Sequence, residues 1–279
     1  MRIILTIARL TVHEAARKRV LLAALLLGAA FVAVYATGFH FIVKGLAGGM
    51  GAAALAERRF TFTMFTLAGL YAANFLGVMA AVLLPIDTLS GEIASGVAQT
   101  LAARPIRRSE ILLGKWSAYV LVVVAYLLLL ATGVLLVAAL VAGYTPPHVA
   151  RGLALMALEV ILLATLSIAG GSRLATVTNG MLAFGLYALA FIGGWVEQIG
   201  ALTHNTAARD VGTIASLVMP TESLWQLAAH EMQPALFAQM HLTPFSPASV
   251  PSPAMVGWAV GWAAVVLLLA LRGFSQRPL

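Results

Sequence analysis

Two residue pairs are of types that could form a catalytic or phosphate-binding motif: a histidine beside a glutamate and a glycine beside a lysine. His230-Glu231 begins like a zinc-peptidase helix, in which two histidines four residues apart bind the metal and the glutamate acts as base. Pro234 stands where the second histidine is required, so we exclude that site. Gly114-Lys115 lacks the earlier glycine and the following Ser or Thr of a phosphate-binding loop. Because the chain also has no Gly-x-Ser-x-Gly motif and no cysteine, it predicts no catalytic centre.

Histidine and methionine side chains recur between residues 197 and 253, and soft ligands of these types suit copper. The two tightest pairs are His230 with Met232 and Met240 with His241. Spacing alone does not show that these pairs converge on one ion. We therefore assign no metal site and keep copper contact as an alternative.

The composition excludes most water-soluble folds. Of the 279 residues, 61% are hydrophobic and 10% are charged, against about 45–50% and about 25% in ordinary soluble domains. The net charge of +7 reflects scarce acids more than abundant bases, and in a membrane protein such an excess orients the chain. A soluble enzyme, a disordered chain and a nucleic-acid-binding protein are therefore excluded.

Six apolar stretches are long enough to cross a bilayer, whose hydrocarbon core of about 30 Å needs about 20 helical residues. They are Val20–Val43, Phe60–Leu84, Trp116–Ala142, Val149–Gly171, Val177–Val196 and Ala254–Leu271. The first follows a long charged segment and exceeds the apolar run of a signal peptide, so we expect it to be retained. The sequence predicts an all-α integral membrane protein with six transmembrane helices in one domain, residues 1–279.

Lysine and arginine residues set the expected orientation. With the N-terminus in the cytoplasm, 12 of the 17 basic residues fall on the cytoplasmic side and 5 on the other, as the positive-inside bias requires. Both termini are then cytoplasmic. Residues 2–19 carry a polar stripe at helical spacing, which predicts an amphipathic interfacial helix along the inner surface; a simple extension of the first span is the alternative. Residues 85–115 form the cytoplasmic segment, and the proline-rich residues 197–253 form the external segment.

One acid, Glu159, lies near the middle of the fourth span. A carboxylate at that depth costs at least about 2.5–3.5 kcal/mol, so it should face the bundle interior or a wet cavity. It is either a pore contact for substrate or protons, with Asn74 as a second candidate, or a protonated carboxyl that hydrogen-bonds to Asn74 or Ser167. Both interpretations stay open.

Gly257 and Gly261 form a small-residue motif on the sixth span. Glycines four residues apart permit the close approach of two membrane helices. We expect these two residues to serve helix packing.

The cytoplasmic segment is the most informative part of the sequence. It predicts a short helix, a break at Pro105 and a second helix that leads into the third span. Ser109 is a candidate N-cap of the second helix, with Arg107-Arg108 as an alternative basic lead-in. Glu92 lies in the first turn of the first helix, where the helix dipole favours an anion. A rigid, charged protrusion close to the membrane is suited to docking a partner protein.

This segment resembles the inner loop of the ABC-2 type permeases, the membrane subunits of ABC exporters. Eleven positions match the family pattern in register over 24 residues: Glu92, Gly96, Leu101, Pro105, Ile106, Arg108, Glu110, Ile111, Leu112, Gly114 and Lys115. Val97 replaces the usual threonine. The interfacial helix, the six spans and the large external segment are also similar to that family. Within it, the single-domain six-span permeases of the NosY-like kind are the nearest in pattern.

The resemblance implies a part in transport. Two permease chains, as a homodimer or a heterodimer, would form the pore and bind two separate ABC ATPase subunits, which would hold ATP and Mg²⁺. Residues 92–103 would be the coupling helix, and coupling to the ATPase would rest on Glu92, Gly96, Leu101, Pro105, Arg108 and Glu110. The resemblance further implies a non-catalytic, multi-pass protein of the bacterial cytoplasmic (inner) membrane. On this resemblance the chain would bind no cofactor itself, and a periplasmic protein is a possible further partner.

Two functions from different classes stay open on the sequence alone. The chain is either the permease subunit of an exporter or a membrane scaffold, an assembly factor that recruits a cytoplasmic partner through the same segment without moving anything. The substrate cannot be read from the residues: lipid, drug, peptide, polysaccharide, ion and copper or sulfur species all remain candidates.

Overall fold

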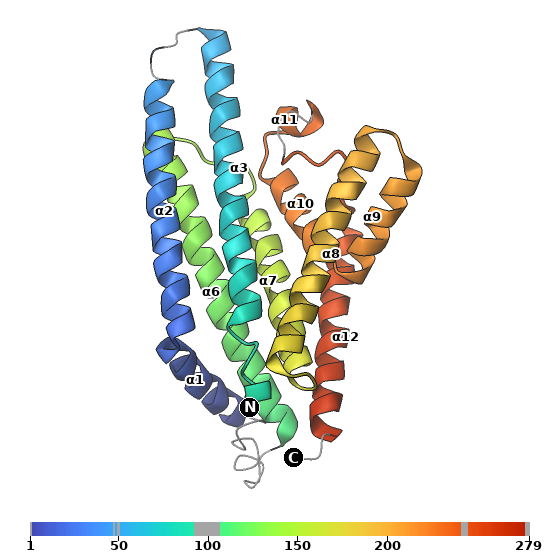
Figure 1. Cartoon of the computed structure of the whole chain (residues 1–279). Helices are drawn as coiled ribbons and strands as arrows, with labels where there is room; N and C mark the ends of the chain where they lie inside the picture. The colour runs from blue at the N-terminus through green and yellow to red at the C-terminus, as the bar shows by residue number, and fades with distance from the viewer. Residues whose placement is uncertain (1, 47, 49–50, 92–106, 241–244, 277–279) are drawn as a thin grey trace.

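The computed structural model describes residues 2–46, 48, 51–91, 107–240 and 245–276, and within these ranges the chain consists of helices, turns and loops (Figure 1). The helices are α1 (Arg2–Arg17), α2 (Arg19–Gly45), α3 (Ala52–Leu83), α6 (Arg108–Ala142), α7 (Val149–Gly171), α8 (Thr176–Leu202), α9 (Thr206–Val218), α10 (Thr221–Glu231), α11 (Ala235–Met240) and α12 (Ala254–Gln276). Six of them, α2, α3, α6, α7, α8 and α12, are long and apolar enough to cross a membrane. The predicted all-α protein with six spans is confirmed.

Several spans are longer than their apolar stretches. Helix α7 begins and ends where the sequence predicted, but α3 begins at Ala52, eight residues before Phe60, and α6 begins at Arg108, eight residues before Trp116. A hydropathy pattern marks the part of a helix that lipid covers, and a helix does not have to end there. The extension carries α3 beyond the upper ends of the other helices, and that of α6 brings its start level with the end of α12 (Figure 1).

Helix α1 is a separate element that packs against α6. The chain bends at Lys18, between the end of α1 and the start of α2. Thr11 and Ala15 of α1 are buried, and an added Cβ at Gly114 of α6 would lie 2.7 Å from the Ile7 side chain. The predicted amphipathic helix is therefore present, but one face of it contacts protein, while Leu5 and Leu10 stay exposed. Thr11, which a purely interfacial helix would turn to water or head groups, is buried instead.

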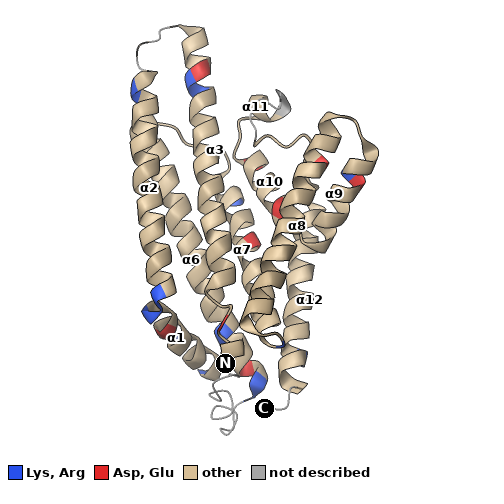
Figure 2. Cartoon of the chain, in the orientation of Figure 1, with Lys and Arg blue, Asp and Glu red and all other residues tan. Residues whose placement is uncertain are grey.

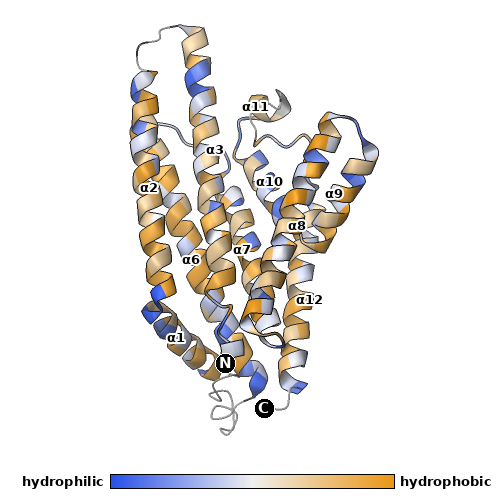
Figure 3. Ribbon diagram, in the orientation of Figure 1, coloured by the Kyte–Doolittle hydropathy of each residue, from blue (hydrophilic) through white to orange (hydrophobic). Residues whose placement is uncertain are grey.

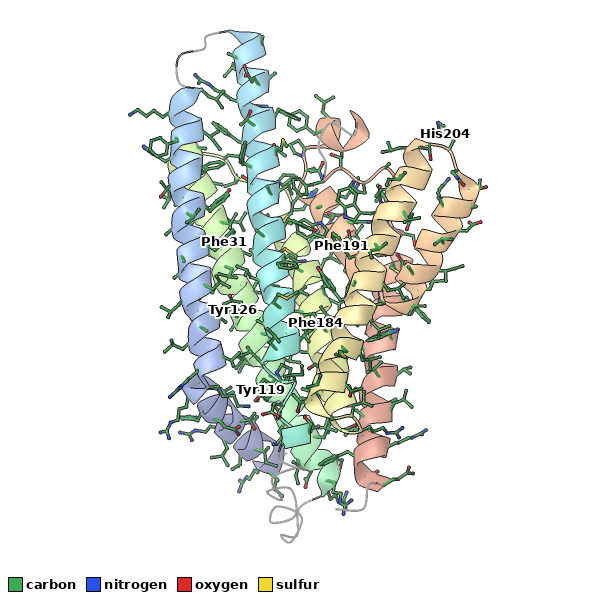
Figure 4. The ribbon with its side chains drawn as sticks, viewed as in Figure 1. Phe31, Tyr119, Tyr126, Phe184, Phe191 and His204 are labelled. Atoms are coloured by element: carbon green, nitrogen blue, oxygen red, sulfur yellow. The ribbon has the colours of Figure 1, made fainter. Side chains whose placement is uncertain are left out.

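Two tyrosines of α6 fix the bend between α1 and α2 (Figure 4). The Lys18 ammonium donates a 3.2 Å hydrogen bond to the Tyr119 hydroxyl, and the Tyr126 hydroxyl donates to the Ala24 carbonyl at 2.9 Å. Tyr119 is fully buried. The N-terminal half of α2 is thus attached to α6 by side chains, although most of its surface faces outward.

The core of the bundle lies around α7, which contacts α3, α6, α8, α10 and α12. Most apolar side chains of α2 and α12 are exposed, whereas those of α3 and α7 are largely buried. Figure 3 shows apolar residues covering the outside of the long helices between more polar ends. This distribution is typical of a bundle surrounded by lipid.

The segment expected to be wholly external, residues 197–253, folds back into the bundle. Helix α9 turns at His204 and returns antiparallel along α8 (Figures 1 and 4). Its last carbonyls, those of Leu217 and Val218, accept hydrogen bonds from Trp258 and Trp262 at 3.0 and 2.9 Å. Trp262 lies eight residues into α12, about 12 Å from its start. The end of α9 therefore lies well inside the bundle, and α10 returns the chain toward the end at which α12 begins.

Candidate functional site

The end of the bundle where α1 begins and α12 ends also carries both ends of the predicted cytoplasmic segment (Figure 1). We call it the inner end, and the opposite one the outer end, after the orientation that the sequence predicts. The Arg108 guanidinium donates to the Ser275 carbonyl at 3.4 Å, which joins the start of α6 to the end of α12. The middle of the segment, 92–106, lies outside the described residues. The predicted coupling helix 92–103 falls there, and so do four of the six positions that the resemblance assigns to coupling: Glu92, Gly96, Leu101 and Pro105.

The first flank of this segment, residues 84–91, is attached to the turn between α7 and α8. Asn179 of α8 donates to the Ser167 carbonyl at 2.7 Å and to the Ile86 carbonyl at 3.4 Å. Thr176 contacts Asp87 at 3.1 Å and the Ser90 hydroxyl at 2.8 Å. These side-chain bonds hold the flank against two transmembrane helices.

The second flank is the first turn of α6. Its N-cap is Arg107, whose N–H donates to the Glu110 carboxylate at 3.2 Å. Ser109 is inside the helix, so its predicted capping role is wrong; the basic lead-in is the correct alternative. Just beyond, the Trp116 indole donates to the Thr165 hydroxyl of α7 at 2.9 Å. Glu110 thus stabilises the start of α6, and α6 is attached to α7 one turn and a half later.

Near its middle, α7 carries the single carboxyl predicted to lie within the membrane. Glu159 is 1% exposed, and its Oε2 accepts a 2.9 Å hydrogen bond from Nδ2 of Asn74 on α3. Ser167, the other partner considered, instead donates to the Val82 carbonyl at 2.9 Å. Glu222 of α10 lies within electrostatic range of Glu159.

Helix α10, which is not one of the six spans, brings this second carboxyl into the bundle. Glu222 is 7% exposed and hydrogen-bonds to Gln226 one turn later. It packs directly on Gly194 of α8, where any larger residue would collide with its side chain. Burial raises the pKa of Glu222 to about 7, although the hydrogen bond from Gln226 opposes that rise.

The two carboxyls form a group with aromatic hydroxyls and without cations. Tyr71 of α3 and Tyr187 of α8 interact electrostatically with both Glu159 and Glu222. Among the described residues, neither carboxyl has a Lys, Arg or His within salt-bridge distance. Figure 2 shows that the charged residues of the chain lie mainly toward the ends of the bundle. Chemically, this group can hold a proton or face a positively charged group.

A family model described as ABC-2 family transporter protein matches residues 5–279. This chain belongs to the ABC-2 transporter family. It is therefore a membrane component of an ABC transporter, and members of the family work with ABC ATPase subunits. No individual curated protein matches the permease.

The structure also places the two glycines predicted to serve helix packing and the candidate copper ligands. Gly257 and Gly261 lie on the exposed side of α12, with nothing within 4 Å of an added Cβ, so they do not pack against any described part of their own chain. Met232 packs on Gly152 of α7, whereas His230 lines an outer pocket. The side chain of Met240 and all of His241 lie outside the described residues. Within the described part, no three His, Asp or Glu residues form a metal site.

Sequence reasoning missed Glu222 and Gln226 of the permease as members of the buried group. The signal was present, because an acid and an amide one turn apart follow Pro220 and are interleaved with the large apolar residues Leu224, Trp225 and Leu227. Because all of residues 197–253 were placed outside the membrane on sequence grounds, polar residues there were expected to face water.

Proposed function

We propose that this permease is the transmembrane subunit of an exporter that is driven by ATP hydrolysis on separate ATPase subunits docked at its inner end. The inner end faces the cytoplasm of a bacterial cell, as the distribution of Lys and Arg indicates. Two copies, or one copy and a related chain, form the translocation path. ATP and Mg²⁺ bind to the ATPase subunits.

One observation carries the proposal: hydrogen bonds connect the chain on both sides of the segment 92–106 to α7, on the first side through Asn179 of α8 and the end of α3, and on the second side through α6. Ser167 accepts from Asn179 and donates to Val82 at the end of α3, while Thr165 accepts from Trp116 of α6. A partner that moves the segment therefore pulls on α7 from both sides.

The same helix carries the buried carboxyl. Glu159 lies six residues before Thr165, about 9 Å away along α7. A displacement at the inner end would thus reach the group that Glu159 forms with Asn74 and Glu222. A scaffold that only recruits a partner has no need for such a connection.

The test is reconstitution of the full chain with a cognate ABC ATPase in proteoliposomes. We expect the ATPase to co-purify with the permease and its turnover to depend on it. Glu92→Lys, within the predicted coupling helix, should lower association or turnover several-fold. Glu57→Lys, the same substitution at the opposite end of the bundle, is the matched control and should change neither.

Two outcomes would contradict the proposal. If no ATPase binds, or if Glu92→Lys and Glu57→Lys behave alike, the segment is not a coupling element. If the ATPase binds but its turnover is the same with and without the permease, the chain recruits a partner without transport, and the scaffold is the correct function.

A further inference from the structure

A cavity of about 870 Å³ opens at the outer end of the chain, between the start of α3, the turn after α6 and helix α11. Cavities of this size are typical of sites for small molecules. The walls are formed mainly by Leu55, Phe62, Leu236 and Phe237, with Tyr144 from the turn. The cavity is unrelated to the buried carboxyls and to the inner end.

The charge of the cavity comes from two neighbouring arginines of α3. Arg58 and Arg59 both line it, and its described lining contains no Asp or Glu. The Arg58 side chain is held by a 2.9 Å hydrogen bond from Nε to the Leu46 carbonyl. Within the described chain, Arg59 has no carboxylate at salt-bridge distance. The site is therefore a basic one, suited to an anion with two or more acceptor oxygens.

Its other walls are apolar and accessible. Leu55 is 60% exposed and Leu236 is 61% exposed, and Phe237 packs edge-to-face on Phe60 with ring centroids 5.9 Å apart. A free inorganic anion would gain nothing from these side chains. An anion that carries a hydrocarbon chain would bury them.

The height of the arginines matches the head-group layer. The Thr63 hydroxyl donates to the Tyr144 hydroxyl at 2.9 Å, which places Thr63 level with the turn that precedes α7. Arg59 and Arg58 lie four and five residues beyond Thr63 on α3, about 6–7.5 Å further out. The polar layer outside the hydrocarbon core is about 5–7 Å thick on each side.

We infer that this cavity binds an anionic phospholipid of the outer leaflet, with its phosphate on Arg58 and Arg59 and the start of its acyl chains against Phe62 and Phe237. Charge, apolar lining and height each point to that occupant. The inference requires that the chain spans a membrane in the proposed orientation, and it does not depend on the ATPase or on transport.

The test is native mass spectrometry of the detergent-purified full chain, titrated with phosphatidylglycerol or phosphatidylcholine. We expect phosphatidylglycerol to bind more tightly. Arg59→Ala should weaken its binding about fivefold and the double substitution at Arg58 and Arg59 about 30-fold, since each arginine near a lipid phosphate contributes about one kcal/mol. Arg209→Ala, a basic residue of α9 outside the cavity, is the matched control and should change nothing.

Because Arg58 also holds the turn at Leu46, the single variant Arg59→Ala is the decisive one if the double variant misfolds. Equal binding of the two lipids, or unchanged phosphatidylglycerol binding by Arg59→Ala, would overturn the inference. Competition with glycerol phosphate tests whether the whole lipid or only its phosphate head group is recognised. We expect no competition at lipid-like concentrations, and equal potency would show an anion site rather than a lipid site.

Discussion

Asn74 of α3 and Glu159 of α7 are joined across the centre of the bundle by a 2.9 Å hydrogen bond, with 2% and 1% of their surfaces exposed. The Oδ1 atom of Asn74 has no described partner. This bond connects the two most buried spans at the depth where an unpaired carboxyl would be most costly. It therefore combines a structural role with a position that a transport mechanism could use.

The bond predicts different effects for its two partners. Asn74→Ala should lower the free energy of unfolding by about 1–3 kcal/mol, because it leaves a buried carboxyl without its partner. Glu159→Gln should be neutral or stabilising, since an amide keeps the bond and cannot ionise. Thermal unfolding in detergent measures the stability of both variants, and a double-mutant cycle gives the interaction energy between the two side chains.

The Glu159→Gln variant also separates structure from function. If it assembles normally and supports unchanged ATPase turnover and transport, Glu159 has only the structural role. Reduced turnover with unchanged stability would make it a participant in the path.

The second carboxyl predicts a dependence of stability on pH. The pKa of Glu222 is raised from 4.5 to about 7 by burial, so the folded state holds this proton more tightly than the unfolded state. The associated stability is fully present below about pH 4.5 and is lost as the pH rises through about 7, a change of about 3 kcal/mol. Glu222→Gln should flatten the profile of unfolding temperature against pH between 5 and 8.

The groups that face Glu222 are Gln226 on its own helix, Tyr71 of α3, Tyr187 of α8 and Glu159 of α7. Glu159 is the one other carboxyl among them, so the profile should be repeated in the Glu159→Gln background. Asp210→Asn, at an exposed acid of α9, is the surface control. This variant should still show the fall in unfolding temperature as the pH rises. A profile that is equally steep with and without Glu222 would show that this carboxyl is not the titrating group.

The spans and the Asn74–Glu159 bond could be predicted because each rests on a local demand. Lipid requires a continuous apolar run, and a lone acid within such a run requires a polar partner. The return of α9 and α10 into the bundle could not be predicted in this way. It is stabilised by pairs distant in sequence, such as Gln198 with Gln226 at 3.2 Å and Glu197 with Ser249 at 2.7 Å. A single sequence shows these residues as polar but does not show that they satisfy one another.

The attachment of both sides of the segment 92–106 to α7 and α8 predicts that some variants lose coupling to the ATPase without losing its docking. Asn179→Ala removes the bonds to Ser167 and Ile86, and Trp116→Phe removes the bond to Thr165. Each should lower permease-stimulated ATPase turnover about 2–30-fold, the usual effect of weakening a coupling path. Binding of the ATPase should stay intact.

Ser117→Ala, which removes only a bond to the Gly114 carbonyl within α6, is the control for that comparison. Turnover and ATPase binding measured on the same preparations check the prediction. If both fall together in Asn179→Ala, the residue shapes the docking surface and does not transmit motion.

The last prediction concerns Gly114, the residue that superficially suggested a phosphate-binding loop. An added Cβ there would lie 2.7 Å from the Ile7 side chain and 3.1 Å from the Ile4 carbonyl oxygen, and a helix backbone cannot yield as a side-chain end can. Gly114→Ala should therefore displace α1 from α6 and cost about 1–3 kcal/mol. Gly257→Ala, where the space is open, should stabilise its helix by about 0.5–1 kcal/mol. Hydrogen exchange of α1 amides measures the displacement directly. Unchanged exchange in Gly114→Ala would mean that α1 does not need this glycine to seat on α6.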